Sequence, residues 1–204
     1  MGSAISVLVR DTIWQISGLA DRVVLLAGKA AVEPGAWRCS KKAYGEIVAA
    51  MTPSVSEPVW EFQHSTECNA PRQFAWRFWT DIANWNDPPA KFDLDGPFEI
   101  GARLTTTLPD QTWYSIIRDL KQESGATIEM QLPDAILSLH WSFEELSENK
   151  TLITQRLVLS GPGAKSLVSQ VNTMEVSAPE GMKKVVAAIE RAQRRAGEGR
   201  EQGC

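Results

Sequence analysis

Few side chains in this sequence have the types and the spacing of a catalytic site. The two histidines, His64 and His140, are the residues whose side chains exchange protons near neutral pH. Two histidines are too few for a three-histidine zinc site, and the chain has neither an H-E-x-x-H nor a G-x-S-x-G segment. The sequence therefore predicts no metal site, no cofactor and no serine-hydrolase nucleophile.

The residues around His64 alternate as those of a half-buried β-strand do. Between Trp60 and Cys68, the side chains of Phe62, His64 and Thr66 fall on the less polar face. An inward imidazole fits two interpretations: it acts as an acid, base or hydrogen-bonding group for a ligand, or it is a core histidine with a satisfied partner. His140 shares its strand face with two serines, so we expect it to point to water.

Composition limits the architecture and the partners. The 204 residues, 43% of them hydrophobic, suffice for one well-buried domain with an extension or for two small domains. The net charge of −4 argues against a nucleic-acid partner, because phosphate binding needs a dense basic surface. Cys39, Cys68 and Cys204 form an odd set without C-x-x-C spacing. This pattern indicates a reducing compartment, and we expect a cytoplasmic protein.

The domain boundary is expected near Pro58, after a segment with the composition of a linker. Residues 1–57 are predicted to be an N-terminal extension of short helices or disorder. Charged residues interrupt its apolar segments before they are long enough to cross a bilayer, which predicts no stable membrane insertion. Residues 58–196 are predicted to form the folded domain, and residues 197–204 a disordered tail.

The longest periodic pattern runs from Gly163 to Arg195. Apolar residues recur there every three or four positions, at Leu167, Val171, Met174, Ala178, Met182, Val185, Ile189 and Ala192. The stripe keeps its phase across Pro179, so we predict one helix that bends at this proline. Such a helix would be roughly 50 Å long, too long to bury its stripe against one neighbouring helix. A broad sheet must cover it.

Alternating segments before this helix supply that sheet. Strands are predicted near residues 60–68, 92–94, 100–106, 112–121, 127–132, 136–146 and 151–160, separated by turn-forming residues. An aromatic stripe from Phe74 to Ile82 predicts a short helix after the first strand, with Asn69 as its N-cap and Pro71 in its first turn. The six later strands have no helices between them, which indicates an antiparallel meander and an α+β domain.

The residues from Pro58 to about Ala196 resemble a known superfamily. The segments Cys68-Asn69-Ala70-Pro71, Trp79-Thr80-Asp81-Ile82 and Asn84-Trp85-Asn86 are similar to the opening of START/Bet v 1-like domains, in the bacterial polyketide cyclase and lipid-transport (SRPBCC) branch. The resemblance implies a helix-grip fold. In that fold a curved antiparallel sheet of about seven strands wraps a long C-terminal helix, with two short helices after the first strand. It also implies a cavity between sheet and helix for a hydrophobic small molecule.

Alternation and the resemblance together select the residues expected to line that cavity. They are Phe62, His64, Thr66, Trp85, Leu104, Thr106, Met130, Leu139, Trp141, Phe143, Met174 and Met182. The same side chains would also serve as ordinary core. In the strand 112–121 the two faces are equally mixed, so the sequence does not choose between Trp113 and Tyr114 as the inward residue.

Three functions fit these expectations. The favoured one is binding or carriage of a lipid, polyketide or aromatic compound, which needs only the cavity. A polyketide cyclase or aromatase would add polar groups, for which His64, Tyr114 and Arg118 are the candidates. A third possibility, suggested by relatives in the superfamily, is an interaction module that stimulates a chaperone through an exposed apolar patch. The sequence leaves the ligand and the oligomeric state open.

Overall fold

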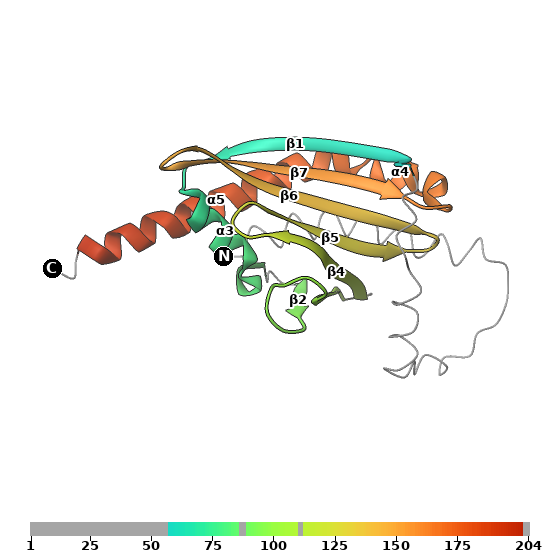
Figure 1. The fold of residues 1–204 in the computed structure, drawn as a ribbon, viewed down its shortest axis with the longest axis horizontal. Coiled ribbons are helices and arrows are strands. Elements are labelled where there is room, and N and C mark those ends of the chain that lie inside the picture. The colour runs from blue at the N-terminus through green and yellow to red at the C-terminus, as the bar shows by residue number, and fades with distance from the viewer. Residues whose placement is uncertain (1–56, 86–88, 110–111, 202–204) are drawn as a thin grey trace.

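A computed structural model of the chain describes residues 57–85, 89–109 and 112–201, without the side chains of 199–201 (Figure 1). The predicted N-terminal extension lies outside these ranges except for Glu57. The described residues form one seven-stranded antiparallel sheet in the order β1-β7-β6-β5-β4-β3-β2. Its strands are β1 (Trp60–Cys68), β2 (Lys91–Leu94), β3 (Arg103–Thr107), β4 (Thr112–Lys121), β5 (Gly125–Leu132), β6 (Ala135–Ser147) and β7 (Lys150–Ser160).

The strand order follows from short connections. From β2 to β7 each strand pairs with the next one along the chain, and β1 pairs with β7 at the other edge. The predicted meander is therefore confirmed. Irregularities interrupt the pairing at two places, between Ile117 and Asp119 in β4 and between Glu145 and Ser147 at the end of β6. Beyond the irregularity in β4 the inward face passes from odd-numbered to even-numbered residues, and Leu120 is the residue that packs on the core.

Two short helices, α3 (Arg72–Thr80) and η1 (Ile82–Trp85), follow β1 as expected. The predicted cap of α3 is wrong. Pro71 occupies the N-cap position without a side-chain hydrogen bond. Asn69 instead donates from both its backbone N–H and its Nδ2 to Oε1 of Glu190, each at 2.8 Å. These bonds fasten the end of β1 to the C-terminal helix.

The C-terminal segment is not one bent helix. It consists of the 3₁₀ turn η2 (Ala164–Leu167), the short helix α4 (Val168–Val171) and the long helix α5 (Met174–Glu201). The break falls before Met174, and Pro179 lies within α5. Thr173 explains the position of the break, because its Oγ1 donates to the carbonyl oxygen of Gln170 and competes with regular helical bonding.

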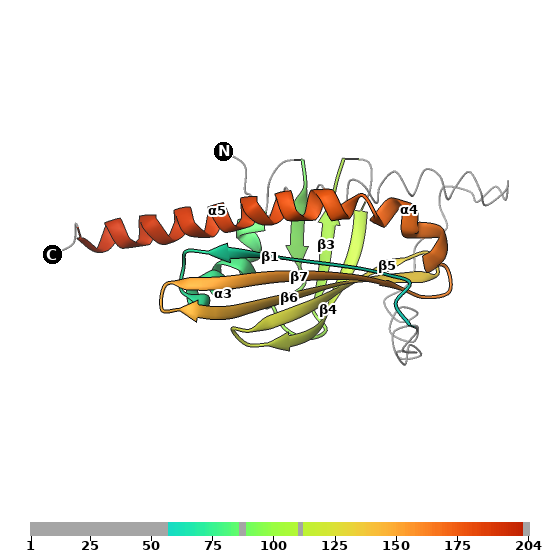
Figure 2. The ribbon, with the colours of Figure 1, turned by 90° about the horizontal axis from the view of Figure 1, so that it is seen from above.

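Helix α5 runs along β1 and covers the concave side of the sheet, and its C-terminal part extends beyond the sheet edge (Figure 2). Every residue of the predicted stripe from Val171 to Ile189 is fully buried, which confirms the inward face of the helix. The helix continues to Glu201, so residues 197–201 are helical and the predicted disordered tail is wrong for them. Among the described residues, none of the helices has the length and apolar composition needed to cross a membrane.

Candidate functional site

The sheet face turned toward α5, here called the inner face, brings together residues from every strand. On this face the register places His64 of β1 opposite Gln155 of β7, and Gln155 opposite Trp141 of β6. A parallel row of apolar side chains flanks them, with Phe62 opposite Leu157. Side chains at directly paired positions lie next to each other on one face. His64 therefore sits in a polar pair inside an otherwise apolar wall.

The His64 ring has one satisfied and one unsatisfied nitrogen. Nε2 lies 3.0 Å from Oε1 of Gln155, within hydrogen-bond distance. Nδ1 is buried and has no hydrogen-bond partner among the described residues. The ring also stacks on Phe62, with the ring centroids 5.6 Å apart. A buried polar atom without a hydrogen bond lowers the stability of the fold by about 1–3 kcal/mol. A ligand group that makes the missing hydrogen bond to Nδ1 would therefore be bound more tightly.

Burial keeps the His64 ring neutral. Desolvation lowers the pKa of His64 from its ordinary value, and the hydrogen bond to Gln155 opposes this shift only in part. Gln155 itself is 1% exposed and His64 is half-buried, so the contact is partly shielded from water. A neutral imidazole offers one donor and one acceptor nitrogen, and the acceptor nitrogen can take up a proton or accept a hydrogen bond from a ligand.

An aromatic cluster fills the inner face beside this pair. It is centred on Trp79 of α3, whose ring lies 5.1 Å from Trp141 and 5.4 Å from Phe98, centroid to centroid. The other rings in contact with Trp79 are those of Trp76, Trp85 and Phe143. Trp85 donates from Nε1 to the carbonyl oxygen of Trp79 at 2.6 Å, which fixes η1 against α3. The predicted residues Trp85, Trp141 and Phe143 thus belong to one packed cluster.

The other predicted lining residues also lie on the inner side. Phe62, His64 and Thr66 are half-buried along β1, and the remainder are buried, namely Leu104, Thr106, Met130, Leu139, Met174 and Met182. They are not all neighbours. Thr106 lies on β3, opposite Trp113 of β4, and five strand spacings separate β3 from β1. At about 4.8 Å per spacing, this corner lies roughly 24 Å from His64 along the sheet.

Tyr114 and Arg118 are not at this site, which corrects their assignment as catalytic candidates. Tyr114 is 58% exposed. Arg118 Nε donates to Oε2 of Glu129 at 2.6 Å on the opposite face of the sheet. The reason is register: Ser115 and Ile117 pair with the inward residues Met130 and Ile128, so their chain neighbours Tyr114 and Arg118 point outward.

The sequence analysis missed the inward residue Gln155 and left Trp113 undecided. Gln155 interrupts an apolar alternation between Ile153 and Leu157, and that alternation was the signal that could have placed it inward. Trp113 also faces inward, and both its Nε1 and the Oγ1 of its cross-strand neighbour Thr106 are buried without a partner among the described residues.

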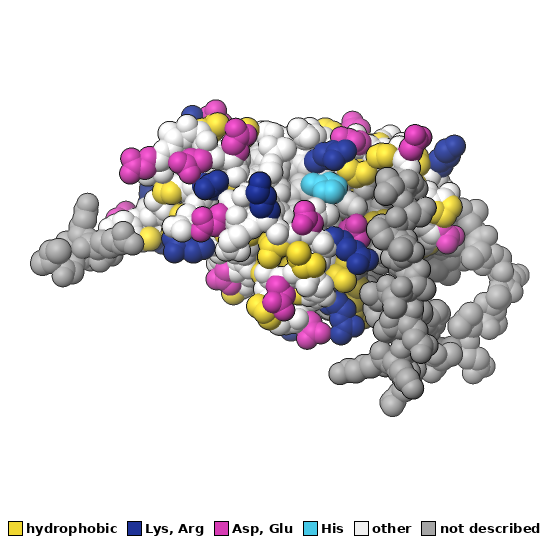
Figure 3. Space-filling model, in the orientation of Figure 1, with side chains coloured by type: hydrophobic (Ala, Val, Ile, Leu, Met, Phe, Trp, Pro, Cys, Tyr) yellow, Lys and Arg dark blue, Asp and Glu magenta, His cyan; other side chains and the backbone are white. Residues whose placement is uncertain are grey.

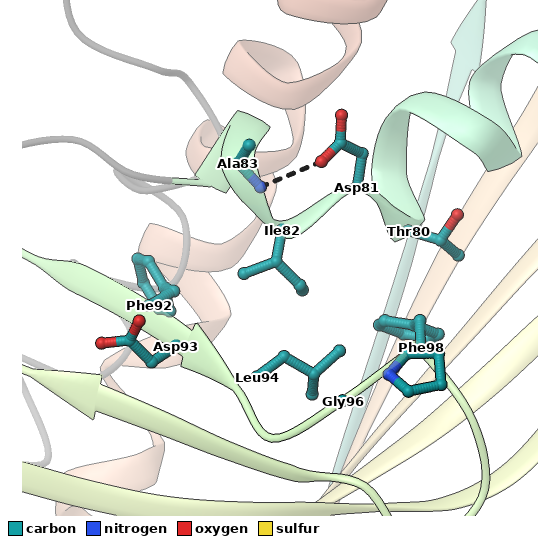
Figure 4. A pocket seen from close by; sticks show the side chains of 10 residues that line it. Thr80, Asp81, Ile82, Ala83, Phe92, Asp93, Leu94, Gly96 and Phe98 are labelled. Carbon is teal, nitrogen blue, oxygen red and sulfur yellow. Dashed lines mark hydrogen bonds between the residues drawn. The ribbon is translucent and has the colours of Figure 1, made fainter.

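A separate recess opens at the end of the sheet near η1. This pocket, of about 400 Å³, is lined by residues 80–83 and by β2 with the loop that follows it (Figure 4). Ile82, Leu94 and Phe98 form its apolar part, and Asp81 accepts a hydrogen bond from the backbone N–H of Ala83 at 3.1 Å. None of the predicted ligand-binding residues lines this recess. The ring of Phe98 separates it from Trp79 in the core.

The outer face of the sheet carries interspersed charges of both signs (Figure 3). Arg156 makes a two-point contact with Glu61, at 2.6 and 2.8 Å. His140 belongs to this face, where its Nδ1 lies 3.0 Å from Oγ1 of Thr127. The two histidines therefore occupy opposite faces of the sheet.

Comparison with known proteins adds a fold but no close relative. No protein-family model matches the chain, and no curated protein matches it. A norcoclaurine synthase point mutant of Thalictrum flavum, in complex with a transition state analogue, aligns over 69% of this chain and 98% of its own with a TM-score of 0.55 and 13% identity. The same enzyme with dopamine and hydroxybenzaldehyde aligns over 65% of this chain and 85% of its own, with a TM-score of 0.51 and 14% identity.

The Zhui aromatase/cyclase of a Streptomyces species is similar at a lower level, with a TM-score of 0.49 and 16% identity over 67% of this chain and 94% of its own. At sequence identities this low, the structural similarity shows a shared fold and nothing about function. The curved seven-stranded sheet, the two short helices after β1 and the long C-terminal helix show that this chain has the Bet v 1-like, helix-grip fold.

Proposed function

We propose that this protein binds a hydrophobic small molecule against the inner face of its sheet, under α5, with His64 as the polar contact. The observation that carries the proposal is the buried Nδ1 of His64, which has no partner among the described residues. The side chains around it on the inner face are aromatic and aliphatic and belong to the buried core. A few placed polar groups in an apolar surround are what orients a small ligand.

The fold supports the same proposal. Solved structures of a helix-grip enzyme hold a transition state analogue in one case and dopamine with hydroxybenzaldehyde in another. These ligands belong to that enzyme. They illustrate that a fold of this shape accommodates compact aromatic molecules, which suits an inner face rich in tryptophan and phenylalanine.

A cyclase-type enzyme is the second candidate, and His64 is the observation that favours it. A neutral imidazole with one free nitrogen can accept a proton from a bound substrate. The candidate is weaker than the carrier because Tyr114 and Arg118 point away from the inner face. Loss of turnover in a His64 variant that still binds ligand would favour the enzyme over the carrier.

The interaction-module alternative has less support. It calls for a contiguous exposed apolar patch. The large hydrophobic residues that the described part of the chain exposes are Ile100, Tyr114, Leu146 and Val176. Leu146 lies near the C-terminal end of β6 and Val176 in the first turn of α5, at opposite ends of the sheet, so these two residues do not share a patch.

A titration with matched variants tests the proposal. The full chain is titrated with N-phenyl-1-naphthylamine, a neutral apolar fluorophore, and compared with His64→Phe and His140→Phe. We expect saturable binding, a weakening of up to about tenfold in His64→Phe for one lost hydrogen bond, and no change in His140→Phe on the opposite face. Absence of saturable binding to the wild type would refute the proposal, as would equal weakening by both substitutions.

A further inference from the structure

We infer that the ligand of the inner face is an uncharged molecule that donates a hydrogen bond to Nδ1 of His64, through a hydroxyl or an N–H group, and that carboxylates are excluded. The inference rests on the proposed function and names the chemical class of its ligand. It follows from the tautomer of His64, from the charges near the inner face, and from the effect of both on the polar group of a ligand bound there.

The tautomer is set by Gln155. Its Oε1 faces Nε2 of His64 at 3.0 Å, and an amide oxygen can only accept a hydrogen bond. With the Gln155 amide in this orientation, Nε2 carries the proton, and in the neutral ring Nδ1 is left with a lone pair. The contact is held in place because the two residues are directly opposite in the β1–β7 ladder and Gln155 is 1% exposed. A ligand group at Nδ1 must be a donor.

The inner face provides no positive charge for an anion. The described side chains at the inward strand positions around His64 and along the buried stripe of α5 are uncharged, and Glu145, at an inward position of β6 opposite Thr151, is negative. The cation at the start of α3, Arg72, has the carboxylate of Glu145 as its counter-charge, with Nε 3.8 Å from Oε2, although this buried Nε makes no hydrogen bond among the described residues. A carboxylate placed beside His64 would bring its oxygens toward the Nδ1 lone pair and would lose its hydration without a counter-charge.

These two features discriminate among otherwise similar ligands. A hydroxyl or N–H group completes the hydrogen bonding of His64 at no cost in charge. An ether of the same shape fills the space but leaves Nδ1 unpaired. A carboxylic acid of the same shape must either be buried as the ionised carboxylate, in a low-dielectric interior, or be protonated before it binds. The expected order of affinity is therefore alcohol or phenol, then ether, then carboxylate.

Three naphthalenes of similar size test this order on the full chain at pH 7, with tryptophan fluorescence as the readout. They are 1-naphthol as the donor, 1-methoxynaphthalene as the donor-free match and 1-naphthoate as the anion. We expect 1-naphthol to bind roughly two- to twelvefold more tightly than the ether, the range for one hydrogen bond, and 1-naphthoate to bind more weakly than both.

Variants assign the effect to the pair. In His64→Phe the advantage of 1-naphthol over its ether should disappear, whereas His140→Phe should keep it. In Gln155→Leu the tautomer is no longer fixed, so the ring can present an N–H at Nδ1 and the ether should gain relative to 1-naphthol. This last comparison does not depend on whether His64→Phe folds.

The possible outcomes distinguish a failure of the proposed function from a failure of the proposed ligand class. If none of the three compounds binds the wild type, the proposed function fails. If they bind and 1-naphthoate equals or exceeds 1-naphthol, the function stands and the inference is wrong. An equal affinity of 1-naphthol and its ether for the wild type would also overturn it.

Discussion

Replacement of Val185 by aspartate tests whether α5 is held by burial of its stripe against the sheet. Val185 is fully buried in the middle of α5, among core residues such as Met182 and Ile189. Removal of a buried valine side chain costs about 1.5–3 kcal/mol. An aspartyl group that must stay protonated in the core at pH 7 costs about 4 kcal/mol more, since its ordinary pKa is about 3.9 and each unit is worth about 1.4 kcal/mol.

The sum, about 6 kcal/mol, is comparable with the whole stability of an ordinary domain. The loss should also depend on pH. Between pH 4 and 7 the unfolded chain ionises the new aspartate while the folded chain keeps it protonated, so the folded state binds more protons and stability falls as pH rises. Acidification should therefore recover part of the loss, by about 1.4 kcal/mol per unit at most.

The matched control is Val176→Asp in the same helix. Val176 is 76% exposed and lies in the first turn of α5, where a negative charge is favoured by the helix dipole. We expect a change within about 0.5 kcal/mol. Urea unfolding followed by circular dichroism, at pH 7 and pH 5, measures both variants. Equal tolerance at the two positions would refute the packing of α5 on the sheet.

Four further outcomes follow from the structure. Burial raises the pKa of Cys68 to about 12, so a thiol reagent at pH 8 should modify it only after unfolding, which a variant without the other two cysteines would reveal. Thr151→Val should cost about 1–3 kcal/mol, because the buried Oγ1 of Thr151 donates to the carbonyl oxygen of Ala70 at 2.7 Å; exposed Ser65→Ala, measured beside it, should cost far less. Burial lowers the pKa of His64 in the folded chain, so as the pH falls below about 6.5 the unfolded chain binds a proton at this residue before the folded chain does. The wild type should therefore lose stability relative to His64→Phe between pH 7 and pH 5. A stability difference that stays constant over this range would contradict the prediction. A chain that starts at Met51 should keep the melting temperature of the full chain, since the sheet and α5 bury their core against each other, and a large drop would show that the preceding residues contribute.

The sequence determined the elements whose pattern is local. Period-two alternation in β1 and the three- and four-residue steps of the α5 stripe are set by backbone geometry, and burial on the inner side leaves the same residues inward in the folded chain. The order of hairpins followed from turn residues between short strands. For this reason the antiparallel sheet, the long helix against it and the inward position of His64 could be predicted before any contact was known, and the resemblance to START/Bet v 1-like domains added the helix-grip arrangement.

Tertiary structure decided what depends on register and on competition between neighbours. The inward face of β4 could not be predicted because both its faces are mixed, and pairing with β5 assigns Tyr114 and Arg118 to the outside. The break before Met174 depends on a side-chain hydrogen bond of Thr173, which periodicity does not register. The contact of His64 with Gln155 joins residues 91 positions apart, so only the β1–β7 pairing could bring them together and fix which ring nitrogen remains free.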